Sequence, residues 1–143
     1  MIKFENVSVT YPGGVEALKD LNLEINDGDF IIIVGLSGAG KSTLLRTVNN
    51  LVRPSTGSVY LEGKNVTSAK KKELKKIRSQ IGMIFQTFNL VNRSTVLKNV
   101  LTGRLSNIST IRSILGLWPK DQKEMAFEAL NQVEILEKAY VRA

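Results

Sequence analysis

Hydrophobic and polar residues alternate along the first thirty positions of the chain, as they do in antiparallel strands that bury one face. The alternation runs from Ile2 to Tyr11, with a slip near Asn6, and returns from Leu21 to Ile25. A Pro-Gly-Gly turn at 12–14 separates the two segments, and a polar turn at 26–29 follows the second. The pattern therefore predicts a pair of antiparallel strands within residues 1–30.

The pattern changes at Phe30, where a run of consecutive apolar residues begins and continues to Val34. A short, continuously apolar and β-branched run is typical of a strand that is covered on both faces in a parallel sheet. A glycine-rich segment follows, and apolar residues from Leu44 to Leu51 then recur at helical spacing. The order predicts a buried strand, a loop and a helix, with further short strands at 59–61 and 81–85.

The second half of the chain shows helical rather than strand periodicity. Apolar positions predict helices at 96–101 and 111–115, with a break at 116–119. Asp121 and Glu124 have the spacing of an acidic capping pair for a last helix. Four residues of this helix are expected to share one apolar face: Ala126, Ala129, Leu130 and Val133.

Composition adds size and chemical limits to this picture. The 143 residues are 43% hydrophobic, enough to build a core without disulfides, and no apolar run approaches the ~20 residues that cross a bilayer. The chain contains no cysteine and no histidine, which excludes thiolate nucleophiles, thiolate or imidazole metal sites and histidine acid-base catalysis. Its chemistry must come from backbone amides, lysine, hydroxyls, side-chain amides and carboxylates.

Charge points to polyanionic partners. Twenty Lys and Arg residues against thirteen Asp and Glu residues give a formal charge of +7. The stretch from Lys70 to Arg78 holds five lysines and one arginine and supplies most of the excess. Leu74, Ile77 and Ile81 recur there at helical spacing, which predicts an amphipathic helix with a charged, solvated face. Contact of this face with nucleic acid or a membrane is the alternative.

The strongest functional signal is Gly35-Leu36-Ser37-Gly38-Ala39-Gly40-Lys41-Ser42-Thr43, which fits the phosphate-loop pattern G-x-x-x-x-G-K-[ST]. Glycines allow consecutive N–H groups to point inward around an anion, and the start of the following helix adds free donors and partial positive charge. Lys41 would hold the outer phosphates, and the Ser42 hydroxyl would coordinate Mg²⁺. Thr43 would support the helix start or the inner phosphate.

Three features at matching spacing give a resemblance to the nucleotide-binding subunits of ABC transporters: Tyr11, the loop GLSGAGKST and Gln86. The resemblance implies an α/β fold of the P-loop NTPase class, ABC type. It implies a β subdomain at about 1–30, a P-loop core at 30–86 with an inserted lysine-rich helix, and a Q-loop and helical subdomain at 87–143. Tyr11 would stack on adenine, and the Gln86 amide would contact Mg²⁺ or the attacking water.

Residues 88–101, 103–105 and 115–119 are similar to the ATPase subunits of phosphonate importers. In that family the region receives a helix of the permease, so the resemblance implies a peripheral ATPase at the cytoplasmic face of the membrane. ATP and Mg²⁺ would be its ligands. Its partners would be the permease, a second ATPase subunit and, indirectly, a solute-binding protein. Nucleic acid is not expected as a partner.

A working member of this family also needs a signature segment, a strand ending in a magnesium-binding Asp and a catalytic Glu, and a switch His. None of these occurs in the chain, whose only aspartates are Asp20, Asp27, Asp29 and Asp121. The resemblance therefore implies the N-terminal portion of a longer subunit, incomplete at its C-terminus. In the family the missing strand flanks the strand at 31–34, so an exposed apolar edge is expected. Lys41 and Gln86 are left as catalytic residues, and ATP with Mg²⁺ is expected to be bound but poorly hydrolysed.

Two other functions fit part of the pattern. A phosphate-loop nucleotide kinase would need a mobile arginine-bearing lid, for which Arg93, Arg104 and Arg112 are candidates without a lid pattern. A nucleic-acid-binding module would use the lysine-rich helix. A guanine-specific switch is not expected, since neither D-x-x-G nor N-K-x-D occurs in the chain.

Overall fold

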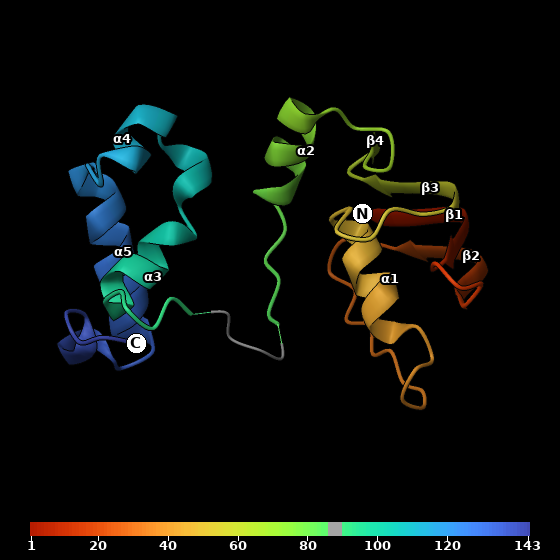
Figure 1. The fold of residues 1–143 in the computed structure, drawn as a ribbon, viewed down its shortest axis with the longest axis horizontal. Helices are drawn as coiled ribbons and strands as arrows, with labels where there is room; N and C mark the ends of the chain where they lie inside the picture. The colour runs from red at the N-terminus through yellow and green to blue at the C-terminus, as the bar shows by residue number, and fades with distance from the viewer. Residues whose placement is uncertain (86–89) are drawn as a thin grey trace. The chain divides into compact units, whose positions relative to one another are not determined.

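The computed structural model describes residues 1–85 and 90–143. These residues form two compact units, Met1–Gly82 and Met83–Ala143, seen in Figure 1 as a sheet with helices and as a group of helices. The expectations on Gln86 and on residues 87–89 lie outside the described residues. None of the helices within the described ranges combines the length and the apolarity that a bilayer crossing requires.

The first unit is built on a four-stranded antiparallel sheet with the order β2-β1-β3-β4. Its strands are β1 (Ile2–Thr10), β2 (Glu16–Ile25), β3 (Thr56–Leu61) and β4 (Lys64–Asn65). The predicted pair of strands within the first thirty residues is confirmed, and so is the strand at 59–61. Phe4 of β1 is paired with Val59 of the neighbouring strand β3, and both side chains are buried.

The slip near Asn6 is a β-bulge. The register of β1 against β2 shifts between Phe4 and Val7, and Asn6 takes a left-handed conformation with φ 48°. Asn22 holds it from β2: the Asn6 N–H donates to Asn22 Oδ1 at 2.9 Å, and Asn22 Nδ2 donates to Asn6 Oδ1 at 3.0 Å. On β3, a Cβ at Gly57 would come within 2.2 Å of the Asn6 carbonyl oxygen. The bulge therefore requires glycine at this position of β3.

Two helices, α1 (Lys41–Val48) and α2 (Lys71–Arg78), complete the core of the first unit. Leu44 of α1 and Ile77 of α2 join a buried cluster that also contains Phe4, Val7, Val59, Leu61 and Val66. Both predicted helices are present, and each ends before the last apolar residue of its pattern.

Arg78 links α2 to the end of α1. Its Nε donates to the Asn49 carbonyl oxygen at 2.8 Å, and its Nη2 donates to the Asn50 carbonyl oxygen at 3.0 Å. These two carbonyls lie just beyond the last residue of α1, where helix carbonyls lack intrahelical partners. The guanidinium therefore satisfies the C-terminal end of α1 and fixes α2 beside it.

The expected buried strand from Phe30 to Val34 is wrong, because these residues belong to no strand in the structure. A strand of a parallel sheet takes its hydrogen bonds from neighbouring strands, and no strand of the described residues pairs with this segment. Ile33 packs against the core of the first unit, while Phe30 is 86% exposed and Ile32 and Val34 are also exposed. The segment is thus an exposed apolar stretch directly before the glycine-rich loop.

The expected strand at 81–85 is also wrong, since these residues form no strand. Ile81 packs against the core of the first unit, whereas Ile84 is 99% exposed. Both segments have the composition of strands, but that conformation depends on neighbouring strands that the sheet of the described residues does not supply.

The second unit consists of helices. They are α3 (Val96–Thr102), α4 (Thr110–Ile114) and α5 (Lys120–Gln132), with 3₁₀ helices at Leu105–Asn107 and Leu136–Lys138. Five buried apolar residues form its core: Leu97 and Leu101 from α3, Ala126 and Leu130 from α5, and Ala139. The predicted helices at 96–101 and 111–115 and the break at 116–119 are confirmed, with shifts of one residue at the ends.

The expected acidic cap of the last helix is wrong. α5 begins at Lys120 with Pro119 at the cap position, so Asp121 already lies in the first turn. The Asp121 carboxylate accepts a hydrogen bond from the Gln122 side chain at 2.7 Å, and no side chain caps the helix. The physical reason is Pro119, whose ring fixes φ at a value that suits the entry to a helix, so the cap lies two residues before Asp121.

The buried face of α5 is narrower than expected. Ala126 and Leu130 are buried together with Gln122, whereas Ala129 and Val133 are exposed. The buried residues are spaced by four positions because α5 packs against α3 along a single stripe.

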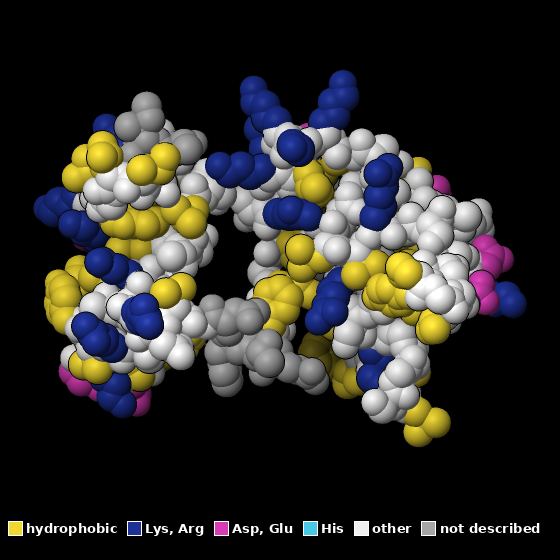
Figure 2. Space-filling model, in the orientation of Figure 1, with side chains coloured by type: hydrophobic (Ala, Val, Ile, Leu, Met, Phe, Trp, Pro, Cys, Tyr) yellow, Lys and Arg dark blue, Asp and Glu magenta, His cyan; other side chains and the backbone are white. Residues whose placement is uncertain are grey.

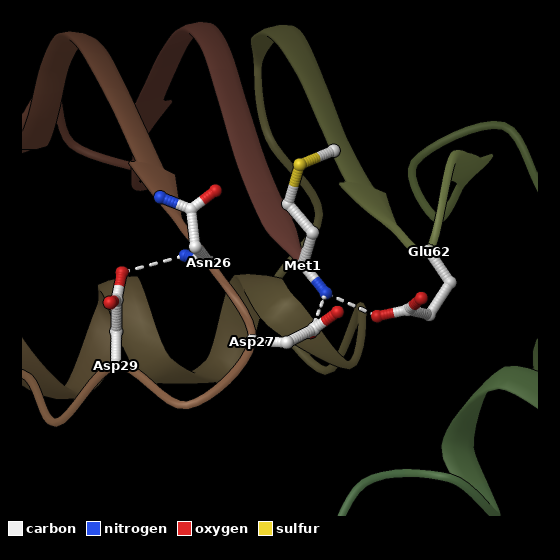
Figure 3. A network of polar contacts seen from close by, with 5 residues as sticks. All are labelled: Met1, Asn26, Asp27, Asp29 and Glu62. Carbon is white, nitrogen blue, oxygen red and sulfur yellow. Dashed lines mark hydrogen bonds and ion pairs between the residues drawn. The ribbon is translucent and has the colours of Figure 1, made fainter.

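A polar network joins the start of β1 to the turns that follow β2 and β3. Figure 3 shows the Met1 ammonium between the carboxylates of Asp27 and Glu62, to which it donates hydrogen bonds. These bonds raise the pKa of the Met1 ammonium, because both carboxylates favour its charged form. In the turn after β2, the Asn26 N–H donates to Asp29 Oδ2 at 2.8 Å. The network therefore fixes the chain immediately before the exposed stretch at 30–34.

Candidate functional site

The glycine-rich loop at 35–40 leads directly into α1 (Figure 1). Gly38 and Gly40 both take left-handed conformations, with φ 83° and φ 84°. A Cβ at Gly40 would lie 2.2 Å from the Ala17 carbonyl oxygen on β2, so only glycine fits between the loop and the sheet. A Cβ at Gly38 would meet no atom within 4 Å. The loop is therefore packed on one side and borders open space on the other.

Ser37 and Ala39 form the exposed turn of this loop. The Ala39 N–H donates to the Leu36 carbonyl oxygen at 3.2 Å, which closes a tight turn over residues 36–39. Both side chains are exposed and small. The turn thus leaves the loop backbone accessible to a ligand.

Lys41 folds back over the loop. Its Nζ donates to the carbonyl oxygens of Gly35 at 2.6 Å and Leu36 at 2.7 Å. An ammonium group has three donors, so one remains for a further acceptor while these two contacts hold. The contacts place a positive charge against the loop backbone, where it would meet any anion that the loop binds.

The start of α1 adds backbone donors to this charge. The first hydrogen bond of the helix runs from the Leu44 N–H to the Gly40 carbonyl oxygen at 2.9 Å. The N–H groups of Lys41, Ser42 and Thr43 come before it and have no acceptor within the helix. The helix N-terminus carries partial positive charge, and the exposed Ser42 hydroxyl can accept or donate. Donors, charge and open space together fit a polyphosphate group.

Tyr11 lies beside the first turn of α1. Its hydroxyl is 3.1 Å from the Thr43 hydroxyl oxygen, close enough for a hydrogen bond in which either group donates. Thr43 is buried, while the Tyr11 side chain is 37% exposed. The contact brings the end of β1 to the phosphate loop. No sequence pattern predicted it, because it joins residues 32 positions apart.

The metal part of the site stays a prediction. The described residues contain no group of three or more His, Cys, Asp or Glu side chains that could hold a metal ion. Ser42 is exposed at the start of α1, and Gln86 lies outside the residues that the structure describes. Binding of Mg²⁺ by Ser42 and Gln86 would therefore also require ligand oxygens from the phosphates and from water.

Comparison with known proteins gives a consistent set of relatives. The ABC transporter family model matches residues 18–143. "Phosphonates import ATP-binding protein PhnC" of Bacillus thuringiensis subsp. konkukian (strain 97-27) is 57% identical over 143 residues, which are all of this chain and 56% of that protein. "Phosphonates import ATP-binding protein PhnC 3" of Halalkalibacterium halodurans is 51% identical over the whole chain and 55% of its own length. The chain spans about half the length of these curated relatives.

Solved structures resemble the fold as a whole. The post-hydrolysis, dimeric ATP-binding cassette MJ0796 bound to ADP and Pi superimposes with a TM-score of 0.84 at 34% identity, covering 99% of this chain and 61% of that one. A nucleotide-free ATP-binding cassette from an ABC transporter gives a TM-score of 0.77 at 29% identity, covering 100% of this chain and 57% of that one. The described residues thus resemble these cassettes in fold, although residues 30–34 and 81–85 form no strand.

Proposed function

Because the chain belongs to the ABC transporter family, we propose that it forms part of an ATP-binding and ATP-hydrolysing subunit that drives solute uptake through a membrane permease. The observation that supports this most is the phosphate loop: Lys41 lies on the loop carbonyls, and the free N–H groups at the start of α1 adjoin it. The nucleotide-kinase alternative has no comparable support, since the family match covers residues 18–143.

Different residues of the site would contact different parts of the nucleotide. The loop N–H groups and Lys41 would bind the phosphates, Ser42 and Gln86 would bind Mg²⁺, and Tyr11 would lie against adenine. ATP supplies the phosphoanhydride bond whose hydrolysis drives transport, and Mg²⁺ offsets the phosphate charge. Thr43 would position Tyr11, because the hydroxyls of the two side chains are 3.1 Å apart, within hydrogen-bond distance.

The solute of the proposed importer is phosphonate or a related oxyanion, as the names of the relatives suggest. The chain would not contact that solute. Its partners would be a permease, a second copy of the ATPase subunit and, indirectly, a solute-binding protein. The dimeric state of the related cassette MJ0796 supports the second of these. A subunit with these partners would lie at the cytoplasmic face of the membrane as a peripheral protein.

Titration calorimetry tests the nucleotide part of the proposal. The folded 143-residue chain is expected to bind ATP in the presence of Mg²⁺ with one site per chain. Turnover is expected to stay far below the ~1 s⁻¹ that enzymes commonly reach, because these residues include no signature segment and no Asp-Glu strand end to orient water. Absence of ATP binding by a folded sample would contradict the proposed function. Steady turnover near that rate would contradict only the expected low activity.

Two substitutions at Tyr11 separate its ring from its hydroxyl. Tyr11→Phe keeps the ring and leaves the buried Thr43 hydroxyl without this partner, so the free energy of unfolding should fall by about 1 kcal/mol while ATP affinity stays unchanged. Tyr11→Ala also removes the ring and should weaken ATP binding about fivefold to tenfold. Urea unfolding and ATP titration measure the two effects. Equal ATP affinity for wild type and Tyr11→Ala would exclude adenine stacking.

A further inference from the structure

A group of lysines on α2 and β4 has no acidic partner. Figure 2 shows Lys and Arg side chains gathered around α2. Six lysines of this region are exposed: Lys64 on β4, Lys70 just before α2, and Lys71, Lys72, Lys75 and Lys76 within it. In the described ranges, lysine ion pairs join Lys3 to Glu5, Lys19 to Glu16 and Lys120 to Glu124, and none includes these six.

Four of these lysines converge on one groove. The groove has a cavity volume of about 430 Å³ and is lined by Lys64, Lys70, Lys72, Glu73, Lys76 and Ile77. Ile77 is 1% exposed and forms part of the buried core, so it anchors this wall of the groove. Lys72 and Lys76 are four positions apart and share one face of α2. Lys64 comes from β4, so side chains of two separate elements line the same groove.

The lysines of this group repel one another when nothing is bound. Lys72 and Lys76 form a like-charge pair at the spacing that brings side chains together on a helix, and Lys71 and Lys75 form a second one. Lys70 at the cap position makes no capping hydrogen bond, and positive charge at a helix N-terminus opposes the helix dipole. Glu73 is the one acidic residue that lines the groove, against four lysines. A multivalent anion in the groove would relieve the repulsion among the four lysines that line it.

We propose that this groove is a second binding site, for a phosphate-rich anion, at a place separate from the phosphate loop. Ammonium groups are compact charges with three donors each, which suits phosphate oxygens. The groove shares no residue with the loop at 35–43. No aromatic side chain lines it, so it lacks the stacking surface that single-stranded nucleic acid binding uses. Phospholipid headgroups and soluble polyphosphate are the two sources of this ligand chemistry.

The test uses the whole chain on a Lys41→Ala background, so that the phosphate loop contributes little to phosphate binding. Lys72→Gln with Lys76→Gln removes two groove charges, and Lys98→Gln with Lys138→Gln removes two exposed charges that do not line the groove. The probes are inorganic tripolyphosphate and phosphatidylcholine vesicles with and without phosphatidylglycerol. The groove variant is expected to bind the active probe at least about tenfold more weakly than the control variant.

Each outcome decides the proposal. Binding of tripolyphosphate alone supports it with a soluble ligand, and binding of phosphatidylglycerol vesicles alone supports it with a lipid ligand. Equal losses in the groove and control variants, or no binding of either probe, overturn it, as does binding of duplex DNA in place of both probes. Circular dichroism checks that α2 remains folded. Lys64→Gln, which lies outside α2, should also weaken binding and keeps the test valid where the helix variant unfolds.

Discussion

Replacing Lys41 with alanine is expected to weaken ATP binding by about 10-fold to 100-fold, since a hydrogen bond to a charged group contributes about 1.5–3 kcal/mol. The Lys41 ammonium lies 2.6 Å and 2.7 Å from two loop carbonyl oxygens, so it is already positioned beside the phosphate site. Titration calorimetry with ATP and Mg²⁺ measures the change in affinity. The free energy of unfolding should change little, because Lys41 is not part of the buried core.

A matched control variant shows whether the loss of one positive charge is by itself enough to change ATP affinity. Lys138→Ala removes one exposed lysine of the second unit and should leave ATP affinity unchanged. Adenosine, which lacks phosphates, should bind the wild-type chain and Lys41→Ala equally. If Lys41→Ala bound ATP as tightly as Lys138→Ala, the loop would not be the phosphate site.

Gly40→Ala is expected to lower the free energy of unfolding by about 2–5 kcal/mol and to abolish ATP binding. The new Cβ would lie 2.2 Å from the Ala17 carbonyl oxygen, and φ 84° is strained for alanine. The loop must then move away from β2, which displaces the donors that precede α1. Urea unfolding and ATP titration of the same sample measure both effects.

Gly38→Ala separates backbone strain from collision. Gly38 has φ 83°, almost the same as Gly40, but a Cβ there would meet no atom within 4 Å. Its free energy of unfolding should therefore fall by only about 1 kcal/mol. Equal destabilisation by Gly38→Ala and Gly40→Ala would show that the approach of Ala17 is not what requires glycine at position 40.

The sequence predicts those elements whose cause lies in nearby residues. Alternation within residues 1–30 predicts the paired strands, and the break in it marks the bulge at Asn6. The run from Phe30 to Val34 carries an equally clear strand pattern, yet it forms no strand. A strand requires hydrogen-bonding partners from elsewhere in the chain, and an apolar run gives no information on whether they are present.

The candidate site divides in the same way. The loop at 35–43 could be predicted because its glycines, its lysine and its hydroxyls are consecutive in the sequence. The approach of the Ala17 carbonyl to Gly40 and the contact of Tyr11 with Thr43 join distant positions, and no local pattern encodes them. The role of Gln86 stays a prediction.

Arg78 connects the positions of α1 and α2 in the first unit. By donating to the carbonyls of Asn49 and Asn50, its guanidinium holds α2 against the C-terminal end of α1, the helix whose N-terminal end is proposed to bind phosphate. A small shift of α1 along its axis would therefore also displace α2. The two proposed anion sites would therefore be coupled through α1, Arg78 and α2. Binding at one site would then change the affinity of the other without any contact between their ligands.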